Sequence, residues 1–228
     1  KRLGGLLKVE QVRNGYSPYW MSYGGGGFHD EPPQAADVDW DAFLLGREKR
    51  SFNAHQYQNW YGYSEFSQGP HTNLMVHFID LMHFTTGVEF PSKVVAVGGT
   101  YRWKSEFDVP DSVEVVYEYP EGFLVRYCTM FGNGANNYAK WFGTLGTVDA
   151  ARLSPREKWV ATGEGSGEPD KIAARIEIDE PATVHHMQDF IECIRTGRKP
   201  IAPIEAGFSH SVAVIAADQA MREGRRLT

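Results

Sequence analysis

Three polar side chains share one face of a predicted helix over residues 73–86. Asn73, His77 and Asp80 are spaced i, i+4 and i+7, so they point in roughly one direction, while the other face is apolar. An imidazole can take or give a proton near neutral pH, and an amide beside it can orient a hydroxyl group. The pattern supports two hypotheses: a functional site on this helix, or polar groups that satisfy one another in a core.

The polar residues of this helix have different expected roles. His77 is the candidate general acid or base, and Asn73 is the candidate that orients a substrate, because an amide cannot take the proton itself. Asp80 lies a turn later and is expected to hold a loop or a backbone group. His83 lies well around the helix from His77 and is expected in the core or at an interface.

Residues 47–71 are polar and aromatic, with little periodicity, which predicts a long loop close to the site. Carbohydrate sites use flat aromatic faces together with amide and guanidinium donors. We therefore expect this segment to contact a sugar, although polar composition is also usual for surface loops. The candidate substrate-binding residues are Arg50, Asn53, His55, Tyr57 and Trp60.

The spacing of histidines and cysteines does not favour a metal site. His55, His71 and His77 could approach one another, but no tight H-x-H or H-x-x-x-H pair is present, so we predict no metal. Cys128 and Cys193 each lie in an apolar run and are expected to be small buried residues without a disulfide.

The composition is that of a globular protein with ample apolar material for a core. Its 228 residues carry a formal net charge of −6, which argues against nucleic-acid binding. No apolar run approaches the roughly 20 residues of a membrane span. No signal peptide is visible, but the sequence does not begin with Met, so export stays open beside a cytoplasmic default.

The element order predicts an α+β domain, 1–228, with an open, mainly antiparallel β-sheet and helices on one face. Tight-turn residues at 120–122 and 144–146 predict two antiparallel hairpins. The helix over 73–86 is expected to pack beside the two C-terminal helices. The predicted strands are 6–13, 94–103, 112–119, 122–131, 140–143, 147–152, 157–161 and 172–178, and the other predicted helices are 39–46, 183–197 and 204–222.

The glycine run at 24–27 is predicted to be a flexible loop. It lacks the G-x-G-x-x-G spacing of a dinucleotide-binding turn, and it has neither a hydrophobic strand before it nor a helix after it. No Rossmann domain is therefore predicted within these residues.

Four segments, in order, resemble the C-terminal domain of the Gfo/Idh/MocA oxidoreductases, the glucose–fructose oxidoreductase and inositol dehydrogenase group. Asn73, His77 and Asp80 match that family's D-x-x-x-H-x-x-D helix. Residues 39–46 (D-W-D-A-F-L-L-G), with Arg50, Asn53, His55 and Trp60 after them, are similar to a segment of a bacterial subgroup. Residues 140–147 (K-W-F-G-T-L-G-T), and the tail H-M-Q-D-F-I-E-C-I with R-K-P at 186–200, are similar to its hairpin and C-terminal motifs.

The resemblance implies the substrate-binding and oligomerisation domain of an enzyme that oxidises a sugar or cyclitol hydroxyl. NAD or NADP would be held by an N-terminal domain absent here, so none is expected to bind this chain alone. The resemblance also implies a homodimer or homotetramer through the open sheet face, and the partly apolar character of both strand faces agrees with this. No nucleic-acid or membrane partner is expected.

Two departures from the family pattern keep other functions open. Asn73 stands where the family has an aspartate, and the Glu-Lys-Pro segment of the missing first domain is absent. One alternative is a binding or assembly module of the same fold without redox activity. The other is a lyase, hydrolase or epimerase on a keto-sugar that uses His77 alone.

Overall fold

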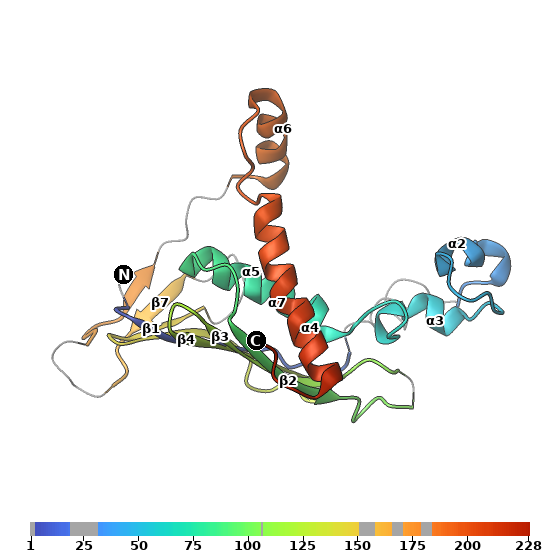
Figure 1. The fold of residues 1–228 in the computed structure, drawn as a ribbon, viewed down its shortest axis with the longest axis horizontal. Helices are drawn as coiled ribbons and strands as arrows, with labels where there is room; N and C mark the ends of the chain where they lie inside the picture. Colours follow the sequence, from blue (N-terminus) through green and yellow to red (C-terminus); the bar gives the residue numbers. More distant parts are fainter. Residues whose placement is uncertain (1–2, 19–31, 106, 151–157, 166–170, 179–183) are drawn as a thin grey trace.

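One open β-sheet organises the molecule (Figure 1). The computed structural model describes residues 3–18, 32–105, 107–150, 158–165, 171–178 and 184–228. The strands are β1 (Leu6–Val12), β2 (Lys93–Gly99), β3 (Ser112–Tyr119), β4 (Phe123–Met130), β5 (Tyr138–Gly143), β6 (Thr147–Asp149), β7 (Trp159–Thr162) and β8 (Ile176–Ile178). Their order is β2-β3-β4-β1-β5-β6-β7-β8, and every neighbouring pair is antiparallel except β1 and β4. The predicted mainly antiparallel sheet is confirmed.

Both predicted hairpins are confirmed, and most strands lie close to their expected ranges. β3 pairs with β4 across a turn at Gly122, whose φ of 93° is a conformation that glycine adopts at little cost. β2 is shorter than the predicted strand 94–103, because the Asp111 carboxylate accepts hydrogen bonds from the backbone amides of residues 101–103. Those amides bind the carboxylate and do not extend the ladder. The predicted loop at 24–27 lies outside the described residues.

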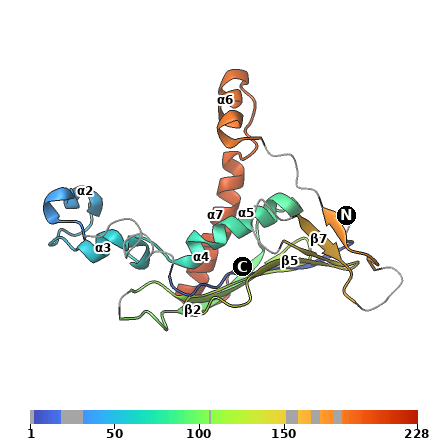
Figure 2. The same cartoon turned by 180° about the vertical axis from the view of Figure 1, so that it is seen from behind.

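Helices α5 (Met75–Thr86) and α7 (Ile204–Glu223) cover one face of the sheet, as predicted (Figures 1 and 2). The burial pattern of β3 alternates, with Val113, Val115, Tyr117 and Tyr119 buried against the helices and the residues between them half-exposed. Each buried Val or Leu side chain contributes about 1.5–3 kcal/mol, so this alternation fixes the register of the strand.

A buried hydrogen-bond chain joins both helices to β3. His83 Nε2 lies 2.7 Å from the Tyr119 hydroxyl, and His83 Nδ1 lies 3.0 Å from Ser209 Oγ on α7. The Tyr117 hydroxyl donates to the Ala213 carbonyl at 3.0 Å. The prediction that His83 is a core residue is confirmed.

Protonation of His83 should destabilise the fold. Burial, followed by the nearby charge of His210, lowers the pKa of His83 to about 4 from 6.5. Because the folded pKa lies below the unfolded one, the penalty is absent above roughly pH 6.5, grows as pH falls, and is complete near pH 4. When the pH is lowered from 7 to 4.5, the free energy of unfolding of His83→Gln should fall by about 2–3 kcal/mol less than that of the natural protein. Denaturant titrations of both proteins at the two pH values measure this difference. Equal losses in the two proteins would contradict this.

The region around residue 74 differs from the single helix predicted over 73–86. Pro70 begins a separate short helix, α4 (Pro70–Asn73), and α5 starts at Met75. The His77 amide bonds to the Leu74 carbonyl at 3.3 Å and not to that of Asn73. Leu74 packs against the main core and also against the smaller cluster of Phe107, Val109 and Phe131. The break therefore lies where the chain passes from one cluster to the other.

Helix α6 (His186–Thr196) also departs from the prediction. It ends at Gly197, as expected, but it stands away from the sheet and does not pack beside α5 (Figures 1 and 2). Its expected start at Thr183 lies outside the described residues.

Residues 38–66 form an arm that extends away from the sheet (Figure 1). The arm contains α2 (Trp40–Leu44), α3 (Ala54–Gln58) and the 3-10 turn η2 (Trp60–Gly62), and the 3-10 turn η1 (Ala35–Asp37) precedes it. As predicted, Asp39 caps the first helix, accepting from the Ala42 amide at 3.0 Å. The expectation of a loop over 47–71 was wrong, because Asn53 caps α3 and Pro70 starts α4.

The open face of the sheet mixes ion pairs with exposed apolar side chains. Arg126 on β4 binds Glu10 on β1 and Glu114 on β3, and Lys8 pairs with Glu10 at 2.7 Å. Burial alone would raise the pKa of Glu10, but hydrogen bonds from Lys8 and Arg126 outweigh it and lower that pKa. Exposed apolar residues of this face are Val95, Val97, Leu124 and Met130. Within the described chain, no helix combines the length and apolarity needed to cross a membrane.

Candidate functional site

His77 is exposed on α5, and the helix beneath it is firmly anchored. Met75, Phe78, Ile79 and Met82 of α5 are fully buried against the sheet. No hydrogen bond or ion pair engages the His77 side chain within the described residues. The imidazole is therefore open to solvent on a rigid support, which suits a group that exchanges protons with a bound molecule.

Asn73 lies just before the helix break and is held by its own loop. Its Nδ2 donates to Ser67 Oγ at 2.7 Å, and the same oxygen accepts from the Gly69 amide at 3.1 Å. Within the described residues no hydrogen bond links Asn73 to His77. The amide oxygen of Asn73 has no hydrogen-bond partner in this part of the chain, so it can accept one from a hydroxyl group.

Asp80 was expected to hold a loop or a backbone group, but within the described residues its hydrogen-bond partner is a histidine side chain. Its Oδ1 lies 3.1 Å from His210 Nδ1 on α7, so the pair connects the two helices at the surface. The sequence interpretation missed this because the partners are far apart in the chain and meet only when α5 and α7 pack together.

A second histidine beside the site has a role that the sequence did not suggest. His71 on α4 is fully buried, and its Nε2 lies 2.9 Å from Asp218 Oδ1 on α7. Burial would raise the pKa of Asp218, but hydrogen bonds from His71 and Arg222 outweigh it and lower that pKa. The pair fixes α4, and with it Asn73, against α7. No sequence pattern connects residues that are 147 positions apart.

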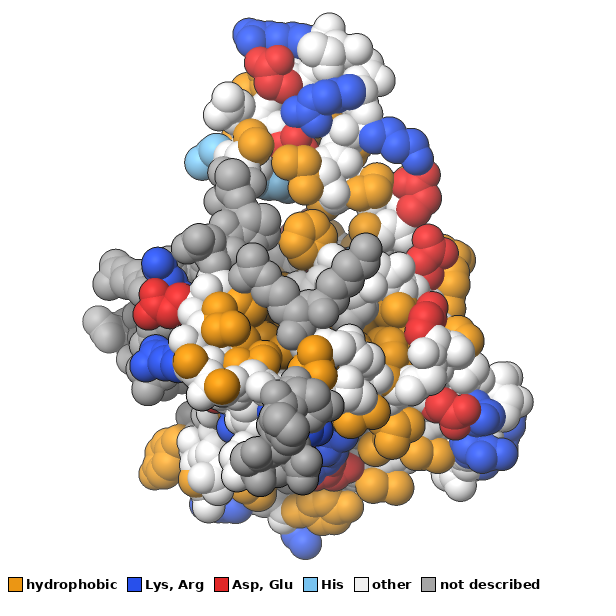
Figure 3. Space-filling model, turned by 90° about the vertical axis from the view of Figure 1, so that its left-hand side faces the viewer, with side chains coloured by type: hydrophobic (Ala, Val, Ile, Leu, Met, Phe, Trp, Pro, Cys, Tyr) orange, Lys and Arg blue, Asp and Glu red, His pale blue; other side chains and the backbone are white. Residues whose placement is uncertain are grey.

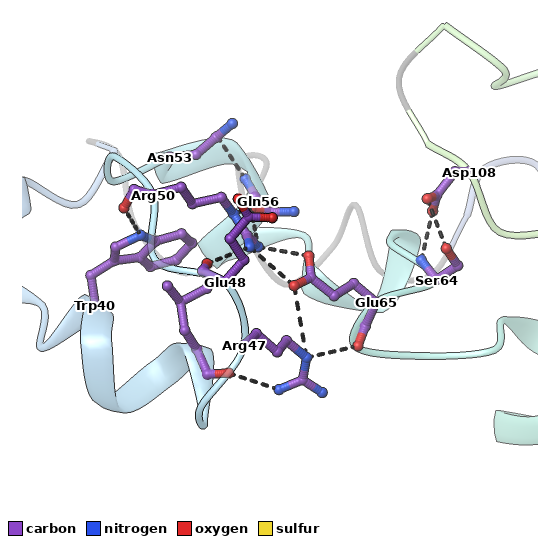
Figure 4. Close-up of polar contacts among 10 residues, drawn as sticks. Trp40, Arg47, Glu48, Arg50, Asn53, Gln56, Ser64, Glu65 and Asp108 are labelled. Atoms are coloured by element: carbon purple, nitrogen blue, oxygen red, sulfur yellow. Dashed lines mark hydrogen bonds and ion pairs between the residues drawn. The ribbon is translucent and has the colours of Figure 1, made fainter.

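Two of the predicted substrate-binding residues, Arg50 and Asn53, hold the arm together (Figure 4). Arg50 Nη1 and Nη2 donate to the two carboxylate oxygens of Glu65 at 3.0 and 2.7 Å, and Nη2 also donates to Gln56 Oε1 at 3.0 Å. Asn53 Oδ1 accepts from the Gln56 amide at 3.0 Å. These contacts use most of the donors of Arg50, which leaves it little capacity for a ligand.

The other three predicted residues present aromatic surfaces. His55 is exposed, its Nδ1 lies 2.7 Å from the Tyr63 hydroxyl, and its ring stacks on Phe107 with centroids 5.5 Å apart. Tyr57 packs edge-on against Phe43 at 4.9 Å. Trp60 stacks on Tyr61 at 3.8 Å. His55 is exposed, and Tyr57 and Trp60 are partly exposed, as residues that offer a stacking surface to a sugar must be.

The arm and α5 extend in different directions in this structure (Figures 1 and 2). Asp108, in the β2–β3 connection, accepts from the Ser64 amide at 2.6 Å and from Ser64 Oγ at 2.8 Å (Figure 4). This contact ties the arm to the β2–β3 connection, and the arm points away from α5 in Figures 1 and 2. The five predicted residues therefore all lie in the arm, which is not folded back over α5.

Metal and thiol chemistry have little support in the described residues. No three His, Cys, Asp or Glu side chains gather there as metal ligands, and His55 and His71 already contact Tyr63 and Asp218. Both cysteines are free and half-buried, whereas buried residues were expected. Burial, followed by a hydrogen bond to Glu114, raises the pKa of the Cys128 thiol to about 12.

Sequence comparison decides the family. Residues 46–228 match the profile described as "Oxidoreductase family, C-terminal alpha/beta domain" (GFO_IDH_MocA_C). The chain belongs to the Gfo/Idh/MocA oxidoreductase family. The resemblance inferred from the motifs is thereby confirmed. A comparison with curated proteins gives no match.

Solved structures of Gfo/Idh/MocA-like fold cover this chain from end to end. Aldose-aldose oxidoreductase from Caulobacter crescentus, complexed with glycerol, is 18% identical with a TM-score of 0.64 over 100% of this chain and 56% of that one. The WlbA dehydrogenase from Bordetella pertussis, in complex with NADH and UDP-GlcNAcA, is 15% identical with a TM-score of 0.61 over 99% and 56%.

UDP-N-acetylglucosamine 3-dehydrogenase GnnA from Acidithiobacillus ferrooxidans is 15% identical, with a TM-score of 0.59 over 97% of this chain and 56% of its own. At these identities the similarity establishes the fold. The chain spans little more than half the length of each of these proteins, and it corresponds to the family's C-terminal domain.

Proposed function

We propose that this chain is the substrate-binding and oligomerisation domain of an NAD- or NADP-dependent oxidoreductase that acts on a sugar or cyclitol hydroxyl. The observation that carries the proposal is His77, an exposed imidazole on a rigidly buried helix in a chain of this family. Proteins of similar structure include an aldose-aldose oxidoreductase, a dehydrogenase in complex with UDP-GlcNAcA and a UDP-N-acetylglucosamine 3-dehydrogenase, which supports a carbohydrate substrate.

Each candidate residue has a role in this proposal. His77 takes the proton of the hydroxyl group that is oxidised, and Asn73 accepts a hydrogen bond from the substrate through its free amide oxygen. His55, Tyr57 and Trp60 offer aromatic surfaces to the sugar ring, while Arg50 and Asn53 keep those surfaces in place. Substrate binding would require the arm to approach α5, or a second subunit to bring its arm there.

The described residues do not fit a dinucleotide. They contain no glycine-rich turn between a parallel strand and a helix, which is the feature that cradles a pyrophosphate. The nicotinamide chemistry therefore belongs to another domain of the full-length protein, and this chain supplies proton transfer and substrate positioning.

The 228-residue chain should bind NAD(H) and NADP(H) very weakly or not at all, because it lacks that cradle. Calorimetric titration of the chain with each nucleotide checks this. Micromolar affinity would contradict the assignment of the cofactor to another domain.

The open sheet face should mediate a homodimer or homotetramer. Val97 and Leu124 are exposed apolar residues of this face, so Val97→Glu together with Leu124→Glu should shift the protein toward monomer in light scattering. Lys104→Glu, outside the strands, is the matched control and should leave the assembly unchanged. A natural chain that is monomeric at working concentrations would count against the proposal.

The function is tested by following reduced nicotinamide in the full-length protein with NAD or NADP and a panel of aldoses, nucleotide sugars and cyclitols. We expect sugar-dependent reduction of the cofactor. Sugar conversion without net reduction would favour the lyase, hydrolase or epimerase, which Asn73 in place of an aspartate keeps open. Neither binding nor conversion would favour an assembly module.

A further inference from the structure

The short helix α4 depends on its surroundings, because four residues do not form a stable helix on their own. Gly69 precedes it with a φ of 91°, and a Cβ added there would lie only 3.1 Å from the Val109 Cβ, so this position favours glycine. His71 binds Asp218 on α7 and thereby fastens the turn to the helix layer. The residue at the end of this fastened turn is Asn73.

Ser67 holds the side chain of Asn73 in one orientation. The serine is 6% exposed, and its Oγ accepts two hydrogen bonds, from the Gly69 amide at 3.1 Å and from Asn73 Nδ2 at 2.7 Å. Both lone pairs of the hydroxyl oxygen are thereby engaged with N–H donors. Such an oxygen attracts the nitrogen of an amide and repels its carbonyl end. The nitrogen of Asn73 is therefore held by Ser67, and its Oδ1 is the end that stays available to a ligand.

A fixed amide gives the site a definite preference among ligands. An asparagine that can rotate offers its donor and its acceptor interchangeably, whereas the oriented Asn73 offers one oxygen on a half-buried side chain. Apolar surface cannot distinguish one arrangement of hydroxyl groups from another, and hydrophobic side chains run up the protruding part of the molecule that α6 and α7 form (Figure 3). Rejection of the wrong sugar therefore depends on oriented polar groups such as Asn73.

We propose that Ser67 is a positioning residue that makes Asn73 a hydrogen-bond acceptor for one hydroxyl group of the substrate. The inference rests on the proposed function, in which His77 takes the proton of another hydroxyl of the same sugar. Held in this way, the amide presents an oxygen where the family motif has an aspartate, although it carries no charge. The site then selects a substrate with a hydroxyl, and not a carbonyl or a hydrogen atom, at that position. Ser67 acts through Asn73 and does not touch the substrate.

The Michaelis constant of the full-length protein tests the proposal. Ser67→Ala frees the Asn73 amide to rotate and should raise KM for the sugar about 3–10-fold. The kcat should stay within about twofold, since the weakened hydrogen bond holds the substrate before and during the reaction alike. Thr72→Ala is the matched control: Thr72 Oγ1 donates to the Gly69 carbonyl at 2.9 Å in the same turn, but within the described residues it makes no hydrogen bond to the Asn73 side chain. Its KM should stay within about twofold of the natural value.

Asn73→Asp separates the orientation of the side chain from damage to the turn. A carboxylate offers an acceptor oxygen in either orientation, so in that background Ser67→Ala should change KM by less than about twofold. A deoxy analogue of the sugar that lacks the hydroxyl bound by Asn73 should be equally insensitive to Ser67→Ala. A rise in KM that persists in the Asn73→Asp protein would show that the serine only stabilises the turn, and would overturn the proposal.

Exchange of the Asn73 side-chain amide protons, followed by NMR in the full-length protein with isotope-labelled asparagine, separates this inference from the proposed function. These protons should exchange at least about fivefold more slowly in the natural protein than in Ser67→Ala. Unchanged KM and exchange in Ser67→Ala, when the natural protein reduces NAD or NADP with a sugar, would refute the role of Ser67 and leave the function standing. Slow exchange in a protein without sugar-dependent reduction would keep Ser67 as the residue that orients Asn73 and refute the proposed function.

Discussion

Replacing His77 by alanine should lower turnover of the full-length protein by about 10²–10⁴-fold and leave its fold intact. The loss is expected because the two neighbouring imidazoles are engaged elsewhere: His83 on α5 faces Tyr119 in the core, and His71 on α4 is held by Asp218. The fold should survive because the His77 side chain makes no described contact that stabilises it. Steady-state kinetics and circular dichroism on the same preparation measure both parts.

Asp80→Asn is the matched control for His77→Ala. Asp80 lies on the same helix and is similarly exposed, but its partner is His210, so this variant should keep turnover within about threefold of the natural protein. A His77→Ala protein with unchanged turnover would remove the histidine from the site. Asn73→Asp should restore the pair usual in the family and raise dehydrogenase activity in the full-length protein; unchanged activity would show that the asparagine is not what limits it.

The fold could be anticipated from local patterns because most of its elements bury one face. The strict alternation of Val113, Val115, Tyr117 and Tyr119 against half-exposed neighbours defines β3 directly. Gly122 and Gly197 end their elements with positive φ, as glycine at a turn or after a helix is expected to do. Where periodicity and a glycine stop coincided, the expected and observed boundaries agree within a few residues.

The misplaced elements depend on contacts that the sequence does not display. The helical pattern of α6 predicted its type, but not that it would leave the sheet, because an apolar helical face does not specify which element covers it. The arm residues look like ligand-binding groups by composition, whereas Arg50 and Asn53 bind Glu65 and the start of α3. Composition identifies donors and acceptors, but it does not say which of them the fold already uses.

The end of the strand β2 depends on a single buried carboxylate, and its removal should be costly. Asp111 is fully buried, and its oxygens accept from the backbone amides of Tyr101, Arg102 and Trp103 at 2.7–3.1 Å. Asp111→Ala leaves these donors without the carboxylate and should lower the free energy of unfolding by about 3–5 kcal/mol. Denaturant titration at pH 7 measures the loss.

Asp108→Ala is the control for Asp111→Ala, because it shows whether any substitution in the β2–β3 connection lowers the free energy of unfolding as strongly. Asp108 binds Ser64 through two hydrogen bonds, but it lies at an exposed contact, so its loss should cost about 1 kcal/mol. The Asp111 variant should also loosen the cluster of Phe107, Val109 and Phe131, since the same turn positions Trp103 beside it. In the proposed site Phe107 carries the stacked His55 ring, so Asp111→Ala should weaken the proposed sugar binding as well as stability. Equal stability losses from the two variants would show that the buried carboxylate is not what holds the turn.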